Sequence, residues 1–156
     1  MESRRILLVA NQTAPGPHLK EIVSERIKEG PCTFVLLVPA APPQSGWTWT
    51  DEEAFAMAEQ QMQQALSGLK DLGAEIEGRV EAGSPLDAIT ALIAKEGYEL
   101  HQGFDEIILS TLPPGVSRWL KQDLPHRIER HFEIPVTHVI GQRSETSVPQ
   151  PGGRDR

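Results

Sequence analysis

Cysteine is nearly absent from this chain of 156 residues, in which Cys32 stands alone. A single thiol excludes an intramolecular disulfide and any zinc site built from cysteines. Long hydrophobic runs are missing too. The longest apolar runs, at residues 6–10 and 34–41, are far too short to span a membrane, and the N-terminal residues lack the apolar stretch of a secretory signal. We therefore expect a cytoplasmic protein that does not insert into a membrane.

Positive charge is also in short supply. The chain has 15 Lys and Arg against 22 Asp and Glu, a formal net charge of −7. An acidic surface disfavours non-specific binding to nucleic acid and to anionic lipid. The rest of the composition, with 38% hydrophobic and 24% charged residues, is ordinary for a globular protein of one domain. A domain of this size buries enough surface to fold without a metal or disulfides.

The common catalytic motifs are missing. The sequence has no Walker loop, no Gly-x-Ser-x-Gly elbow, no His-Glu-x-x-His pair and no Gly-x-Gly-x-x-Gly turn. The histidines are dispersed: His126 and His131 are five residues apart, whereas ligands on one helix face need a spacing of three or four. We interpret His138, on a strand, as a packing or surface residue, and Cys32 as an inert core thiol. The sequence gives no positive sign of an enzyme and predicts no metal site.

Five short apolar segments alternate with helical patterns. The segments, which we predict to be strands, are residues 6–10, 33–38, 74–80, 105–109 and 136–140. The third alternates apolar and charged residues, which is typical of a half-exposed strand near a sheet edge. Repeated strand–helix units predict an α/β fold: a doubly wound, Rossmann-like parallel sheet with helices on both faces.

The ends of the helices are marked by residues that cap or break them. Gly30 and Pro31 stop the first helix, and Thr50 begins a capping box for the longest one, which runs for about 21 residues and ends at Gly73. Ser84 is an N-cap followed by proline, and Asp123 is the expected N-cap of the last helix. We expect residues 39–49 to be irregular because of their prolines. Residues 1–141 would form the domain, and residues 142–156 a disordered tail.

The order and spacing of five segments resemble the universal stress protein (UspA-like) family over residues 4–141. The opening strand is similar to residues 5–11 (RILLVAN), and the Gly-x-Pro turn into the third helix to residues 81–89 (EAGSPLDAI). The fourth strand is similar to residues 104–110 (FDEIILS), the last helix to residues 127–130 (RIER), and the closing strand to residues 134–139 (IPVTHV). The resemblance implies a five-stranded sheet of order 3-2-1-4-5, a cytoplasmic location and a homodimer. Some members of the family bind ATP and others do not.

A sheet of that order reverses its winding between strands one and four, and ligands bind in the crevice at the carboxyl ends of those strands. The possible ligands are ATP or AMP. The ligand-binding candidates are Asn11, Gln12, Thr13, Val38, Gly83, Ser110, Thr111, Gly115, Ser117, Arg118 and Lys121.

The glycine-rich phosphate loop of the ATP-binding members is altered in this chain. Those members have an Asp after the first strand, where this chain has Asn11, and a Gly-x2-Gly-x9-Gly-Ser/Thr loop after the fourth. With a one-residue gap, Ser110 and Pro113 replace the first two glycines, and Gln122 and Asp123 replace the final Gly-Ser/Thr. Prolines offer no amide to a phosphate, and a carboxylate at the helix start competes with it. The resemblance therefore implies a divergent member with a degenerate nucleotide site.

Several candidates also have plain structural interpretations. The 118–121 segment could clamp an anion, or it could form a surface turn anchored by Trp119. The hydroxyls of Ser110 and Thr111 could hold a phosphate, or they could satisfy backbone groups at the end of a strand. Trp47 and Trp49 could stack on a base, or their loop could fold over the sheet.

Three hypotheses for function remain open. The first is a UspA-like small-ligand sensor or interaction module with a degenerate adenine-nucleotide site. The second is a nucleotide hydrolase or phosphotransferase of the adenine-nucleotide alpha-hydrolase group, using Arg118, Lys121, Ser110 and Thr111 on phosphates. The third is a structural homodimer without a ligand, in which the last strand pairs with its copy through an open sheet edge.

Overall fold

The computed structural model of the chain describes residues 4–10, 17–40, 51–96, 104–111, 120 and 123–141. Its strands are β1 (Arg4–Val9), β2 (Cys32–Ala40), β3 (Glu75–Ala82), β4 (Glu106–Thr111) and β5 (Val136–Ile140). Its helices are α1 (Pro17–Glu29), α2 (Asp51–Lys70), α3 (Pro85–Glu96) and α5 (Leu124–Phe132). The predicted tail at residues 142–156, the Trp47/Trp49 loop and Thr50 lie outside the described residues. No described helix is long and apolar enough to cross a bilayer.

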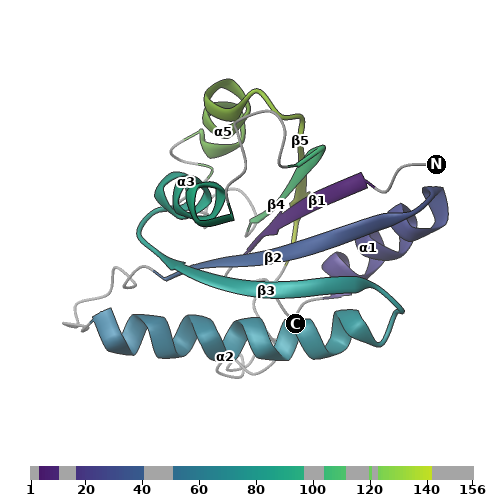
Figure 1. The fold of residues 1–156 in the computed structure, drawn as a ribbon, viewed down its shortest axis with the longest axis horizontal. Coiled ribbons are helices and arrows are strands. Elements are labelled where there is room, and N and C mark those ends of the chain that lie inside the picture. The colour runs from purple at the N-terminus through teal and green to yellow at the C-terminus, as the bar shows by residue number, and fades with distance from the viewer. Residues whose placement is uncertain are drawn as a thin grey trace, which may run out of the picture.

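The five strands form one parallel sheet of order β3-β2-β1-β4-β5 (Figure 1). This is the order that the resemblance implied, and it places β1 between β2 and β4. The chain winds outward from β1 to β3 and then crosses back to β4. Each crossover carries a helix onto a face of the sheet, as expected for parallel neighbours. The α/β, doubly wound prediction is confirmed.

Two hydrophobic clusters fill the space between the sheet and its helices. The cluster under α1 and α2 includes Leu8, Leu36 and Ile108 from the three central strands. The cluster under α3 and α5 includes Leu7, Leu37 and Leu109, the neighbours of those residues on the same strands. Successive residues of a strand point to opposite faces, so the continuous apolar runs of β1, β2 and β4 supply both clusters. Figure 1 shows the two helix pairs on opposite sides of the sheet.

The prediction that residues 39–49 are irregular is wrong for Pro39 and Ala40, and residues 41–49 lie outside the described residues. β2 continues through Pro39 to Ala40 and pairs with β3 as far as Ala82. On its other side β1 has already ended, and the last rung is the bond from the Ala10 amide to the Leu37 carbonyl, 3.2 Å. The backbone nitrogen of Pro39 faces the β1 side of β2, as that of Leu37 does, but it lies beyond the last residue of β1. The amide hydrogen that proline lacks therefore removes no hydrogen bond between β1 and β2.

The helix starts follow the sequence signals with one difference. Ser84 caps α3: its Oγ accepts a hydrogen bond from the Asp87 amide at 3.2 Å. Asp123 is the N-cap of α5, as predicted, but it adopts a left-handed conformation (φ 56°) and its side chain makes no cap hydrogen bond. Its carboxylate instead contacts His126 Nδ1 at 2.9 Å.

A buried carboxylate ties β4 to its neighbours at the amino end of the sheet. Arg26 of α1 donates two hydrogen bonds to Glu106, Nε to Oε1 at 2.9 Å and Nη2 to Oε2 at 2.8 Å. Arg4 adds a bond to Oε1 at 3.1 Å, and Thr137 of β5 donates to Oε2 at 2.5 Å. Burial alone would raise the pKa of Glu106, but these hydrogen bonds and charges outweigh burial and leave the pKa below its usual 4.5. The pairing thus compensates for burying a charge.

Candidate functional site

The winding of the sheet reverses between β1 and β4, and this point marks the candidate site. In open parallel sheets, ligands bind outside the carboxyl ends of the strands at such a reversal. β1 pairs with β4 up to the rung of Val9 and Leu109. The last two residues of β4, Ser110 and Thr111, therefore lie at the carboxyl edge beside the end of β1.

Four of the eleven predicted ligand-binding residues fall within the described residues: Val38, Gly83, Ser110 and Thr111. The other seven lie outside them: Asn11, Gln12, Thr13, Gly115, Ser117, Arg118 and Lys121. The same holds for Pro113, Pro114 and Gln122 of the altered loop. The described part of the predicted site is therefore its sheet side.

The structure places two of these four residues, Val38 and Ser110, on the same rung of the sheet. Val9 pairs with both Leu37 and Leu109, so Val38, Ala10 and Ser110 form the next rung, all on the face covered by α1 and α2. Val38 is fully buried in that cluster, so its side chain is part of the core. Gly83 follows β3, two strands away from β1, and its positive φ of 97° is one that glycine adopts without strain. Val38 and Gly83 thus shape the frame of the site.

Ser110 is bound by a histidine that the sequence analysis did not single out. His18, the second residue of α1, places Nε2 2.5 Å from Ser110 Oγ. Its other ring nitrogen, Nδ1, is buried and has no hydrogen-bond partner among the described residues. Burial lowers the pKa of His18, and nearby Glu21 opposes this shift. The ring is therefore held in its neutral form next to a buried hydroxyl.

Gly141 packs directly against the His18 ring. A Cβ added at Gly141 would lie 2.0 Å from His18 Cε1, far inside contact distance. The Gly141 amide also donates to the Thr111 carbonyl at 2.8 Å, which holds the chain end of β5 beside β4. The residue after the last strand thus helps to fix the imidazole at the carboxyl edge, and only glycine leaves room for it.

Thr111 forms a second hydroxyl–imidazole pair. Its Oγ1 lies 2.7 Å from Nε2 of His138, a residue of β5. Desolvation lowers the pKa of His138 as well. Thr111 follows Ser110 on the strand, so the two hydroxyls point to opposite faces of the sheet. The end of β4 is therefore flanked by a neutral imidazole on each face.

These contacts add to two interpretations made from the sequence. The hydroxyls of Ser110 and Thr111, for which the sequence suggests a phosphate or the local backbone as partner, each contact a histidine as well. His138 is exposed, as its interpretation as a packing or surface residue predicts, and its ring also reaches the predicted site through Thr111. One signal could have revealed His18: it lies in the first turn of the helix after β1, and such helices begin at the carboxyl edge where Ser110 lies.

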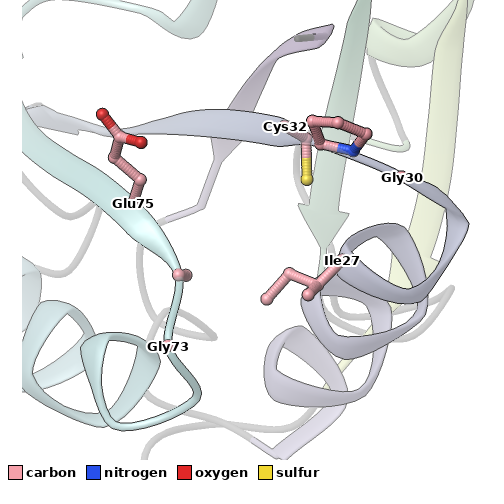
Figure 2. A pocket seen from close by; sticks show the side chains of 7 residues that line it. Ile27, Gly30, Cys32, Gly73 and Glu75 are labelled. Atoms are coloured by element: carbon pink, nitrogen blue, oxygen red, sulfur yellow. The ribbon is translucent and has the colours of Figure 1, made fainter. Parts of the chain in front are cut away.

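A separate cavity of about 310 Å³ lies at the opposite, amino edge of the sheet. It opens between the ends of α1 and α2 and the starts of β2 and β3. Figure 2 shows the Cys32 sulfur pointing toward the Ile27 side of this cavity, with Gly73 and Glu75 across from it. Cys32 is half-buried and packs against the core cluster under α1 and α2, and burial raises its pKa, which matches the prediction of an unreactive core thiol.

The described residues contain no group of three or more His, Cys, Asp or Glu side chains that could hold a metal ion. Each of the two imidazoles at the carboxyl edge bonds a hydroxyl. The chemistry offered by the described part of the site is therefore that of hydrogen bonding: two hydroxyls and two uncharged rings around the end of one strand.

Comparison with solved structures identifies the fold. A universal stress protein from Archaeoglobus fulgidus superposes with a TM-score of 0.58 at 15% identity over 88% of this chain and 94% of that one. A universal stress protein family protein from Arabidopsis thaliana, solved with AMP bound, has a TM-score of 0.58 at 13% identity over 97% and 99%. A universal stress protein in complex with cAMP gives 0.56 at 17% identity over 89% and 98%. The chain therefore has the universal stress protein fold.

No protein-family model and no curated protein matches the chain by sequence.

Proposed function

We propose that this chain is a universal-stress-protein-like small-ligand sensor, or an interaction module, whose carboxyl-edge site takes an adenine mononucleotide in preference to ATP. The observation that carries the proposal is the polar end of β4 at the winding reversal, where Ser110 and Thr111 lie with His18 and His138. Two proteins of the same fold were solved with AMP and with cAMP. Their likeness to this chain supports the choice of adenine nucleotides.

The preference for one phosphate group follows from the donors that the chain can offer. A triphosphate needs a row of backbone amides, and glycine-rich loops supply them. Pro113 and Pro114 of this chain have no amide hydrogen. The Asp123 carboxylate lies at the start of α5, where it repels a further anion. Near neutral pH the two neutral imidazoles add hydrogen-bonding groups but no positive charge.

The hydrolase or phosphotransferase alternative is weaker on the described residues. The Ser110 and His18 pair has the spacing of a nucleophile and its base, but Ser110 is fully buried in the strand. A substrate phosphorus cannot reach a hydroxyl that is closed off by the sheet and by the His18 ring. Binding without turnover is therefore the function we infer.

Calorimetric titration of the full chain with AMP, cAMP, ADP and ATP tests the proposal. We expect saturable binding of AMP or cAMP, weaker binding of ATP, and no release of phosphate from ATP above a blank. Thr111→Val keeps the shape of the side chain and removes the hydroxyl that meets His138, so it should weaken nucleotide binding. Thr33→Val, the same change at the amino end of β2, is the matched control and should leave binding unchanged. ATP binding at submicromolar concentration would contradict the preference, and no binding of any nucleotide would contradict the proposal.

We further propose that two copies associate through β5. In this sheet β5 is an edge strand, and Ile140 on it is 49% exposed. An exposed apolar edge is a template for pairing with a second chain. Light scattering at tens of micromolar protein should give the mass of a dimer, and Ile140→Lys should shift it toward a monomer. A monomeric mass for the unchanged chain would contradict the pairing.

A further inference from the structure

A second hollow lies between α3 and α5, on the face of the sheet that these two helices cover. Its volume is about 300 Å³, and it is lined by Leu86, Arg127, Arg130 and His131. Figure 1 shows these two helices adjacent on one side of the sheet. Leu86 belongs to the first turn of α3, and the other three residues belong to α5. The described lining thus joins two guanidinium groups and an imidazole to one apolar side chain.

The basic residues of α5 are gathered on one side of the helix. Successive residues of a helix are about 100° apart around its axis, so Arg127, Arg130 and His131 share a sector of about 100°. The centre of this sector lies about 130° around the axis from that of Glu129 and Glu133. The buried stripe of α5, which includes Ile128 and Phe132, lies between the two charged sectors. An ordinary solvated helix face would mix both signs. Here the acidic residues turn away from the hollow, and no acidic residue is among the described residues that line it.

Local contacts hold part of this surface in place. The His131 ring meets the fully buried Phe132 ring edge-on, with ring centres 4.6 Å apart and planes at 79°. Arg127 and Arg130, three residues apart, lie on adjacent turns and can approach the same anion. A net charge of −7 makes such a concentration of cations in a concave place unusual for this chain. Arginine forks match the oxygens of phosphate in pairs.

We propose that the hollow between α3 and α5 binds a small phosphate monoester, with the phosphate on Arg127, Arg130 and His131 and the carbon part on Leu86. A volume of about 300 Å³ is at the lower limit of small-molecule sites, which fits a compact ligand. None of these four residues is among those proposed to bind the nucleotide. It gives an acidic protein a place where a small organic phosphate is attracted rather than repelled.

The test is a titration of the isotope-labelled full chain with inorganic phosphate and with phenyl phosphate at constant ionic strength, followed by NMR. Saturable shifts should appear at Leu86, Arg130 and His131 for both probes. Phenyl phosphate should bind more tightly because its ring can pack on Leu86. Arg130→Gln should weaken binding of both probes roughly fivefold. Leu86→Ala should weaken only the binding of phenyl phosphate.

Lys28→Gln is the matched control, because it removes one exposed positive charge from α1 on the opposite face of the sheet. It should leave both affinities unchanged. The proposal is overturned if the shifts do not saturate by about 10 mM of either probe. It is also overturned if Lys28→Gln weakens binding as much as Arg130→Gln does. Arg130 is exposed, so its variant should keep the fold, and the dispersion of the NMR spectrum checks this. With AMP already saturating, phenyl phosphate should still shift Leu86 and Arg130, and loss of those shifts would show that the two sites are one.

Discussion

Replacing Glu106 by Gln should destabilise the fold without touching the candidate site. Glu106 lies at the amino end of β4, whereas Ser110 and Thr111 lie at its carboxyl end. Its side chain is 6% exposed and receives hydrogen bonds from Arg26, Arg4 and Thr137. Glutamine keeps the shape and one acceptor oxygen but removes the negative charge. The two arginines then face a neutral group.

The loss of stability in Glu106→Gln depends on how well water can hydrate the two arginines that pair with Glu106. Breaking a buried ion pair costs about 3–5 kcal/mol because the remaining charge stays buried. Arg26 is 14% exposed and retains Glu29 at 3.4 Å, while Arg4 is 45% exposed and can be hydrated. The retained acceptor oxygen and the exposure of Arg4 reduce the loss to about 2–3 kcal/mol. For a domain of this size, that loss lowers Tm by about 4–12 °C.

Urea denaturation followed by circular dichroism measures this loss directly. Glu77→Gln is the control: Glu77 pairs with Arg79 at 3.0 Å, but its side chain is 57% exposed, so its loss should cost less than about 1 kcal/mol. A loss below 1 kcal/mol for Glu106→Gln, or one equal to that of the control, would refute the reasoning. A second check uses pH. Because the folded pKa of Glu106 lies below its unfolded value of 4.5, its contribution is complete above pH 4.5 and is lost as the pH falls below it. In Glu106→Gln, the free energy of unfolding should therefore fall less steeply as the pH drops below 4.5.

Three further predictions concern the two edges of the sheet. The pKa of His18 is lowered from 6.5, so the folded state resists protonation and the free energy of unfolding should fall as the pH drops below 6.5. His18→Gln should flatten that slope, and an unchanged slope in this variant would contradict the burial of the His18 ring. Gly141→Ala should cost about 1–3 kcal/mol in urea denaturation, because its Cβ would lie 2.0 Å from the His18 ring. Gly68→Ala meets only the flexible end of Lys20 and should be neutral or stabilising, so equal losses for the two variants would argue against a fixed His18 ring. The raised pKa of Cys32 should make alkylation by iodoacetamide at pH 8 slower than that of free glutathione, and an equal or faster rate would contradict the burial of this thiol.

The fold could be predicted because its signals are local and repeated. Apolar runs with few charges marked β1, β2 and β4 as strands covered on both faces, and the mixed pattern of β3 marked an edge. Ser84 capped α3 as predicted. The error at Pro39 came from applying a local rule without the partner strand. Proline disrupts a sheet only where the neighbouring strand would accept a hydrogen bond from its amide. Where β1 ends beside β2 depends on how the two strands pair, which the sequence around Pro39 does not show.

The candidate site was predictable only in part, because contacts between distant residues made it. Ser110 and Thr111 could be found from their place after an apolar run. Their partners are 92 and 27 residues away in the sequence. Only the place of His18 in the first turn after β1 indicates that it lies at this edge, and no local pattern links His138 to Thr111. The close approach of Gly141 to the His18 ring is equally invisible in a sequence, because it depends on where β5 ends relative to the start of α1.

The two hydroxyl–imidazole pairs, Ser110 with His18 and Thr111 with His138, also limit the directions from which a ligand could reach the carboxyl-edge site. Ser110 and Thr111 are consecutive, so their side chains point to opposite faces of β4, and no ligand lying on one face can contact both hydroxyls. Both residues are buried, so a ligand beyond the end of the strand would meet the imidazole rings and not the two hydroxyls. A ligand placed there would meet His18 from the α1 side and His138 from the β5 side. Because His138 belongs to the edge strand and Gly141 follows it directly, the geometry of the nucleotide site and that of the proposed pairing edge depend on the same short segment of chain.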